Sequence, residues 1–177
     1  MKRYVRITML VLLMLFLVVA SLQAQSSVWE IKGPKATVYL AGSLHVLRAS
    51  DHPLPVEFDI AYARSRRIVF EAPLEEMEKP LYLQKLLAAA VYKDGSTLKD
   101  HLRPTLWNKV QKFCRERNHD CEKFSIFRPW MFSIILTMQE LGRIGVEQAY
   151  GVDQVFYEKA KKDGKNFGAL ETVDEQI

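Results

Sequence analysis

Three predicted strands are each followed by a side chain that is capable of acid–base or metal chemistry. His45 comes shortly after the first of these strands, Glu71 ends the second and Glu171 ends the third. In open α/β sheets, ligands bind at the carboxyl ends of the strands, so parallel neighbouring strands would bring the three side chains to one edge. An imidazole and two carboxylates suit a divalent ion such as Mn²⁺, Co²⁺ or Zn²⁺, which polarises a carbonyl and lowers the pKa of bound water. The pattern predicts a divalent-metal site with His45 and Glu71 as its catalytic residues.

The same side chains also have ordinary structural interpretations. A single histidine after a strand is more often a surface or core residue than a ligand, and a strand-ending glutamate is usually solvated. Glu171 could simply lie beside the positive end of a following helix. Asp153 is most simply the N-cap of a helix. Spacing alone does not decide between these interpretations and the metal site.

The elements that must position these residues begin with four strands. Segment 37–41 is rich in β-branched and aromatic residues and lies between two glycines, which predicts a strand. Segment 28–31 is predicted to pair with it as a hairpin. Segments 67–71 and 166–171 are short apolar runs, typical of buried strands in a sheet that is covered on two faces.

Amphipathic or apolar segments between the strands predict helices. Segment 129–141 is apolar nearly all round and is predicted to be a buried core helix rather than a membrane span. Strands alternating with helices indicate an α/β domain with a mixed or mostly parallel sheet and helices on both faces. The predicted helices are 55–66, 78–92, 105–117, 129–141 and 153–163.

Residues 1–24 have the pattern of an export signal. Basic residues in the first six positions are followed by the uncharged run 9–20 and a small residue, Ala24, after which cleavage is predicted. About twelve strongly apolar residues are few for a span that needs roughly 20, although an uncleaved anchor is an alternative. The protein is therefore predicted to be exported, either periplasmic or secreted, with residues 25–177 as one domain.

The charge distribution gives no reason to expect a nucleic-acid partner. The formal net charge is +4, but three of the basic residues lie in the predicted signal, and the remainder is close to neutral. The only two cysteines, Cys114 and Cys121, are seven positions apart across a turn-like segment. In an oxidising compartment they are either a disulfide or two free thiols, and the spacing leaves both open.

The last residues open a new helix that the chain does not continue. Thr172 and Glu175 form the pattern of a capping box, and the chain ends two residues later. Because a helix needs more than one turn to be stable, the domain is predicted to be incomplete at its C-terminus. A frayed tail is the alternative.

A series of short blocks occurs in order along the chain: 28–31, 38–45, 53–55, 68–71, 128–131, 151–153, 164–165 and 170–176. Together these blocks resemble the TraB/PrgY/GumN family. The resemblance implies a fold related to the erythromycin esterase and ChaN-like α/β proteins, and kinship with the Tiki metal-dependent proteases.

The resemblance also implies roles for individual residues. The first Gly-x-x-His motif of the family, which supplies a catalytic or metal-binding histidine, corresponds to Gly42 through His45, and the glutamate ending the next strand corresponds to Glu71. Family members continue into a portion with a second Gly-x-x-His motif, which this chain lacks. That difference puts the activity of this particular chain in doubt.

Three functions follow as hypotheses. The first is an exported, divalent-metal-dependent hydrolase that acts on peptide bonds, with His45, Glu71 and Glu171 at the metal. The second is a non-catalytic peptide-binding or regulatory protein, since sequestering a peptide needs a groove but no metal. The third is an inactive, truncated fragment.

Overall fold

The strands form three two-stranded pairs in the computed structural model, which describes residues 26–177. The predicted signal peptide, residues 1–24, lies outside the described residues. Two pairs are antiparallel and the third is parallel. The pairs are β1 (Val28–Lys32) with β2 (Thr37–Ala41), β3 (Leu47–Arg48) with β5 (Val146–Glu147), and β4 (Arg67–Phe70) with β6 (Asn166–Ala169).

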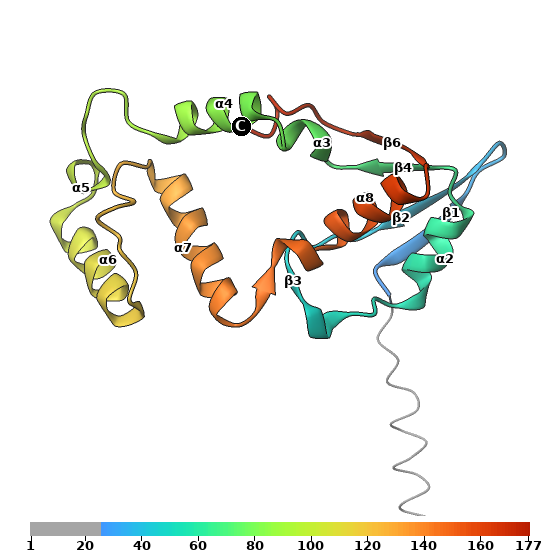
Figure 1. The fold of residues 1–177 in the computed structure, drawn as a ribbon, viewed down its shortest axis with the longest axis horizontal. Coiled ribbons are helices and arrows are strands. Elements are labelled where there is room, and N and C mark those ends of the chain that lie inside the picture. The colour runs from blue at the N-terminus through green and yellow to red at the C-terminus, as the bar shows by residue number, and fades with distance from the viewer. Residues whose placement is uncertain (1–25) are drawn as a thin grey trace, which may run out of the picture.

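Helices connect the strand pairs, and two short 3₁₀ turns, Ala49–Asp51 and Gln148–Tyr150, follow β3 and β5 (Figure 1). The five longer helices lie where the sequence predicts them, within a few residues at each end. Among residues 26–177, no helix combines the length and apolar character needed to cross a membrane. The helices are α2 (Val56–Arg64), α3 (Leu74–Met77), α4 (Pro80–Ala90), α5 (Leu98–His101), α6 (Pro104–Arg117), α7 (Pro129–Arg143) and α8 (Val152–Lys162).

The mixture of helices and small sheets agrees with the predicted α/β class, but the strands do not join into one sheet with helices on both faces. In the part of the chain that the structure describes, β2 pairs only with β1, and β4 pairs only with β6. A hollow lined by both β2 and β4 lies between the two pairs. The hairpin prediction is confirmed, with Val28 opposite Ala41 and Lys32 opposite Thr37.

Two predictions of deep burial are wrong. Of the strand β4, only Phe70 is buried, and β6 is at most half-buried. Helix α7 is not the buried core helix that its apolar sequence predicts, because Phe132 is its only buried residue and Ile134 is 50% exposed. In β4 and α7, the less exposed residues fall on one face of the element.

The buried side chains fall into two groups, which divide the molecule into two regions. The helical arm (residues 80–143, α4 to α7) has a cluster around Trp107 and Phe132. The site lobe (residues 26–73 and 146–177) buries aromatic and small residues of α2, β4 and α8. Within the lobe, the Phe70 ring meets the Tyr157 ring edge-on at a centroid distance of 6.0 Å. Figure 1 shows the arm extending away from the lobe.

A disulfide joins Cys114, near the end of α6, to Cys121 in the turn that follows. Helix α6 ends at Arg117, and the positive φ of 56° at Asn118 turns the chain back. Both half-cystines are buried in the cluster of the helical arm. Of the two arrangements that the spacing left open, the structure has the disulfide.

Candidate functional site

The loop after β2 is held close to the start of β1. Gly42 donates its backbone N–H to the Ser27 carbonyl at 2.7 Å. A Cβ at Gly42 would lie 3.0 Å from the Cβ of Ser27, so a side chain fits there only if Ser27 moves. This close approach carries the chain from the hairpin into Ser43, Leu44 and His45.

The start of α8 meets this loop through a second glycine. A Cβ at Gly151 would lie 2.1 Å from the backbone oxygen of His45, which is closer than two such atoms can approach. Next to it, the backbone N–H of Val152 donates to the Leu44 carbonyl at 2.9 Å. Only a residue without Cβ therefore allows the N-terminus of α8 to lie against the loop that carries His45.

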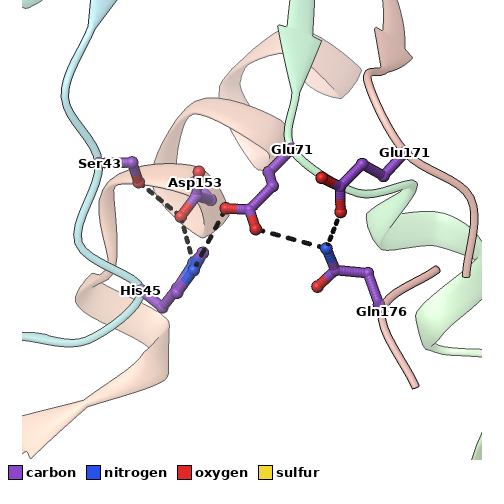
Figure 2. Close-up of polar contacts among 6 residues, drawn as sticks. All are labelled: Ser43, His45, Glu71, Asp153, Glu171 and Gln176. Atoms are coloured by element: carbon purple, nitrogen blue, oxygen red, sulfur yellow. Dashed lines mark hydrogen bonds and ion pairs between the residues drawn. The ribbon is translucent and has the colours of Figure 1, made fainter.

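Asp153 is the residue that this contact brings to His45. Its Oδ2 lies 2.7 Å from His45 Nδ1 and accepts a hydrogen bond from Ser43 Oγ at 2.5 Å (Figure 2). The prediction that Asp153 is the N-cap of α8 is wrong, because Gly151 takes that position and Asp153 is the second helical residue.

The Asp153 contact determines what His45 can do. A neutral imidazole donates Nδ1–H to the carboxylate and keeps Nε2 free of a proton, as a base or a metal ligand. The Asp153 side chain is 14% exposed, whereas that of His45 is 68% exposed. A nearly buried carboxylate thus orients an imidazole that remains open to a substrate.

Glu71 lies on the other side of the imidazole. Its Oε2 is 3.7 Å from His45 Nε2, and its side chain is 55% exposed. Glu71 directly follows β4, and its carbonyl accepts the backbone N–H of Glu171 at 2.9 Å, which continues the parallel pairing beyond β6. The two glutamates therefore leave the sheet side by side.

Gln176 connects the two glutamates. Its Nε2 donates to Glu71 Oε1 at 3.3 Å and to Glu171 Oε2 at 2.5 Å, as Figure 2 shows. The structure thus brings His45 next to Glu71, and it brings Glu171 to Glu71 through the side chain of Gln176. Glu171 makes no contact with His45 among the hydrogen bonds and ion pairs of the described residues.

The number and kind of donor atoms decide whether a divalent metal fits this site. Within residues 26–177, no three His, Cys, Asp or Glu side chains are grouped closely enough to hold a metal ion. The kinds of donor nevertheless suit one, because an imidazole nitrogen and a carboxylate, His45 Nε2 and Glu71, face each other in the open. These two residues would hold the ion. Glu171 lies beside Glu71, and the side chain of Gln176 hydrogen-bonds both glutamates.

The site opens into a hollow of about 410 Å³ between the two strand pairs. Most of its wall is apolar or aromatic, and the polar side chains of the site lie together in it. The lining includes Tyr39, Leu40, Phe58, Tyr62, Val69, Phe156 and Leu170, together with Ser43, His45, Glu71 and Asp153.

Three residues of this arrangement were not among the predicted site residues: Ser43, Asp153 and Gln176. Ser43 and Asp153 lie in two of the blocks that resemble the family, but the order of the blocks does not show that these residues contact each other. Asp153 also fits the start of a helix, and that simpler interpretation obscured its contact with His45. Gln176 had no signal beyond its place in the last block.

The fold and site define a mixed α/β protein in which a histidine oriented by an aspartate faces a strand-ending glutamate. Residues 27–177 match the TraB/PrgY/gumN family, and the chain belongs to that family. A search of curated proteins finds no match to the chain. A search of solved structures also finds none.

Proposed function

We propose that this protein is a divalent-metal-dependent hydrolase that acts on peptide bonds, with His45 and Glu71 as its catalytic pair. The hydrogen bond between Asp153 and His45 Nδ1 is the observation that carries the proposal. It leaves Nε2 as the reactive nitrogen and aims it at Glu71, 3.7 Å away. Ligand histidines and catalytic histidines both depend on such a carboxylate at the other ring nitrogen.

His45 Nε2 and Glu71 would hold the metal, which when bound polarises the substrate carbonyl and acidifies water. The Glu71 carboxylate has a second oxygen, which accepts a proton from the attacking water, whose own oxygen bonds to the carbonyl carbon. The carbon–nitrogen bond then breaks, and Glu71 returns the proton to the leaving amine. Asp153 keeps the imidazole in one orientation throughout.

The hollow supports a peptide as the substrate. Its wall combines aromatic and aliphatic side chains with the free edges of β2 and β4, neither of which pairs on that side within the described residues. An extended segment finds both backbone hydrogen-bonding groups and apolar surface at such an edge. The polar site at the end of the strands would receive the scissile bond.

We also propose that the protein works outside the cytosol, periplasmic or secreted, as its predicted export signal suggests. The disulfide between Cys114 and Cys121 supports this proposal, because disulfides persist in oxidising compartments and are rare in the cytosol.

The test is cleavage of a quenched-fluorescence peptide library by the full chain with added Mn²⁺, Co²⁺ or Zn²⁺. Cleavage should need the metal, stop with a chelator, and fall at least a hundredfold in His45→Ala. The matched control is His101→Ala, which removes an imidazole of the helical arm that hydrogen-bonds Ser96. Equal cleavage by wild type and His45→Ala would refute the assignment of the site.

A non-catalytic peptide-binding protein is the second candidate. It is favoured by the apolar hollow together with the lack of three grouped metal-binding side chains within residues 26–177. Stoichiometric binding of library peptides that is indifferent to chelator, without any cleavage, would select this function over the hydrolase.

A further inference from the structure

The hollow beside the site has one strongly basic side chain in its wall. Arg67, the first residue of β4, is the only lysine or arginine among the described residues that line the hollow. The nearby Arg64 pairs with Glu30, whereas Arg67 has no ion pair and no side-chain hydrogen bond within residues 26–177. A guanidinium without a counter-charge, in the wall of a concave and mostly apolar site, is suited to binding a carboxylate in two parallel hydrogen bonds.

A glycine of the neighbouring strand fixes where this guanidinium lies. A Cβ at Gly168 would lie 2.5 Å from Arg67 Nη2 and 3.3 Å from its Cζ, so the guanidinium rests where β6 has no side chain. Gly168 is the partner of Val69 in the parallel register, so the Arg67 side chain reaches along the sheet toward the end of β4. Since alternate residues of a strand share a face, Arg67, Val69 and Glu71 belong to one face.

The same face carries apolar side chains that no described element covers. Val69 is 48% exposed and Leu170 is 78% exposed, and both line the hollow with Arg67. The opposite face of the strand pair is packed, because Phe70 meets Tyr157 of α8. The uncovered face therefore offers apolar contacts and one positive charge together, which fits an apolar chain that carries a carboxylate.

The separation of Arg67 from Glu71 relates this charge to the proposed catalytic pair. The two residues are four positions apart in the chain, which corresponds to about 13 Å along a strand. An extended peptide that runs antiparallel to β4, with its scissile bond at Glu71, carries its C-terminal part toward Arg67. Its carboxylate reaches the guanidinium when the peptide ends about three residues beyond that bond.

We infer that Arg67 binds the carboxylate of a peptide that lies in the hollow. This inference rests on the proposed function and deepens it, because it names a substrate class: peptides with a free C-terminus a few residues after the scissile bond. A glutamate side chain at the same place presents the same group. The experiment below separates these two sources of the carboxylate.

The test is peptide binding to the full chain without added metal, measured by the fluorescence anisotropy of short labelled peptides. Three pools share one set of apolar sequences: one pool ends in a free carboxylate, one ends in an amide, and one ends in a glutamate whose own C-terminus is an amide. The wild type should bind the first pool about tenfold more tightly than the second, as expected for one hydrogen-bonded charge pair. Affinity for the third pool shows whether a side-chain carboxylate is accepted as well.

Two variants of Arg67 assign the preference to its guanidinium. Arg67→Gln keeps much of the aliphatic chain over Gly168 but removes the charge, so it should bind all three pools alike. Arg67→Lys should keep part of the preference, because it retains the charge without the planar fork. The matched control is Arg66→Ala, which removes a neighbouring exposed arginine that does not line the hollow and should keep the full preference.

Several outcomes would overturn the inference. They are equal binding of the three pools by the wild type, no binding of any pool, a preference that survives in Arg67→Gln, and a preference that Arg66→Ala loses to the same extent. Failure of the hydrolase is distinguishable from these outcomes. An Arg67-dependent preference without any metal-dependent cleavage would refute the hydrolase alone, whereas cleavage without the preference would refute the role of Arg67 alone.

Discussion

The helical arm and the site lobe are held together by different kinds of contact. The cluster of the arm forms within one continuous stretch, from Leu98 to Phe132, and the disulfide closes a loop inside it. In the lobe, the contacts that build the site join residues about a hundred positions apart, such as His45 with Asp153 and Glu71 with Gln176. The arm therefore depends on local packing, and the site depends on a few long-range approaches of the backbone.

Replacing one glycine by alanine in each region is expected to show the difference between the two regions most clearly. Gly151→Ala would place a methyl group 2.1 Å from the His45 backbone oxygen, so the two segments must part. We expect a loss of about 3 kcal/mol in the free energy of unfolding, together with loss of Mn²⁺ binding and cleavage. Urea unfolding and the metal titration measure both effects.

The matched change in the arm is Gly142→Ala, in α7. A Cβ there meets nothing within 4 Å, and alanine is favoured over glycine inside a helix by about 0.5–1 kcal/mol. Unfolding should therefore become slightly harder, with Mn²⁺ binding unchanged. If both alanine variants behaved alike, the contrast between the two regions would be wrong.

Removal of the disulfide tests the arm by destabilising it, whereas Gly142→Ala stabilises it. Replacing Cys114 and Cys121 by alanine should cost about 2.5 kcal/mol of stability, the value expected for closing a short loop in the unfolded chain. The site lobe has its own buried residues, so the Mn²⁺ affinity of the folded variant should not change. Unfolding with and without reductant measures the first effect, and loss of metal binding in the folded variant would show that the regions are coupled.

Asp153→Asn is expected to act on the site with little effect on the fold. The amide retains the size of the side chain but loses the charge that orients Nδ1–H of His45. We expect metal affinity and cleavage to fall tenfold to a hundredfold, with a smaller change in stability. Asp163→Asn, at the end of α8 where Tyr62 donates to the carboxylate, is the control that leaves the site intact. Equal losses of metal affinity in both variants would contradict a special role for Asp153.

The smallest expected effect is a loss of stability at low pH. Both regions contain a threonine that hydrogen-bonds a nearby carboxylate, and this motif tests the effect. Hydrogen bonds from the backbone and hydroxyl of Thr172 lower the pKa of Glu175 below its ordinary value of 4.5. In the arm, Thr97 lowers the pKa of Asp100 below 3.8 in the same way. A lowered carboxyl pKa stabilises the folded turn fully above the ordinary value, and this contribution is lost as the pH falls through the lowered pKa.

Nuclear magnetic resonance of the two threonine amides measures this dependence. The Thr172 amide should shift with a midpoint below pH 4.5, and the Thr97 amide with a midpoint below pH 3.8. A Thr172 midpoint at or above pH 4.5 would mean that the turn carrying Gln176 is not formed in solution.

Much of the local structure could be predicted from the sequence, because short-range rules determine it. The hairpin follows from two runs rich in β-branched and aromatic residues on either side of Gly33 and Pro34. Helix α8 ends as predicted, with Gly164 at a positive φ of 65° just beyond it. The division into three strand pairs had no such signal, since the pairing partners of β2 and β4 depend on contacts between distant segments.

Only part of the site could be predicted from the sequence. His45 and Glu71 follow strands and could be identified as candidates, and the structure places them 3.7 Å apart. The role of Asp153 could not be read from its position, because a capping aspartate and a histidine-orienting aspartate occupy the same kind of place at a helix start. What distinguishes them is the missing Cβ of Gly151, whose effect is visible only when His45 lies against it.

The parallel pairing of β4 with β6 has a consequence for how the protein folds. The two strands are separated by about a hundred residues, and the whole helical arm lies between them along the chain. Forming contacts at such a separation costs loop-closure entropy and is slow. The helices of the arm form from contacts between segments that are close in the sequence. The arm should therefore fold first and shorten the distance that the strands must cross. The arrangement of His45 and Asp153 would then be complete only at the end of folding, when α8 reaches the loop that carries His45.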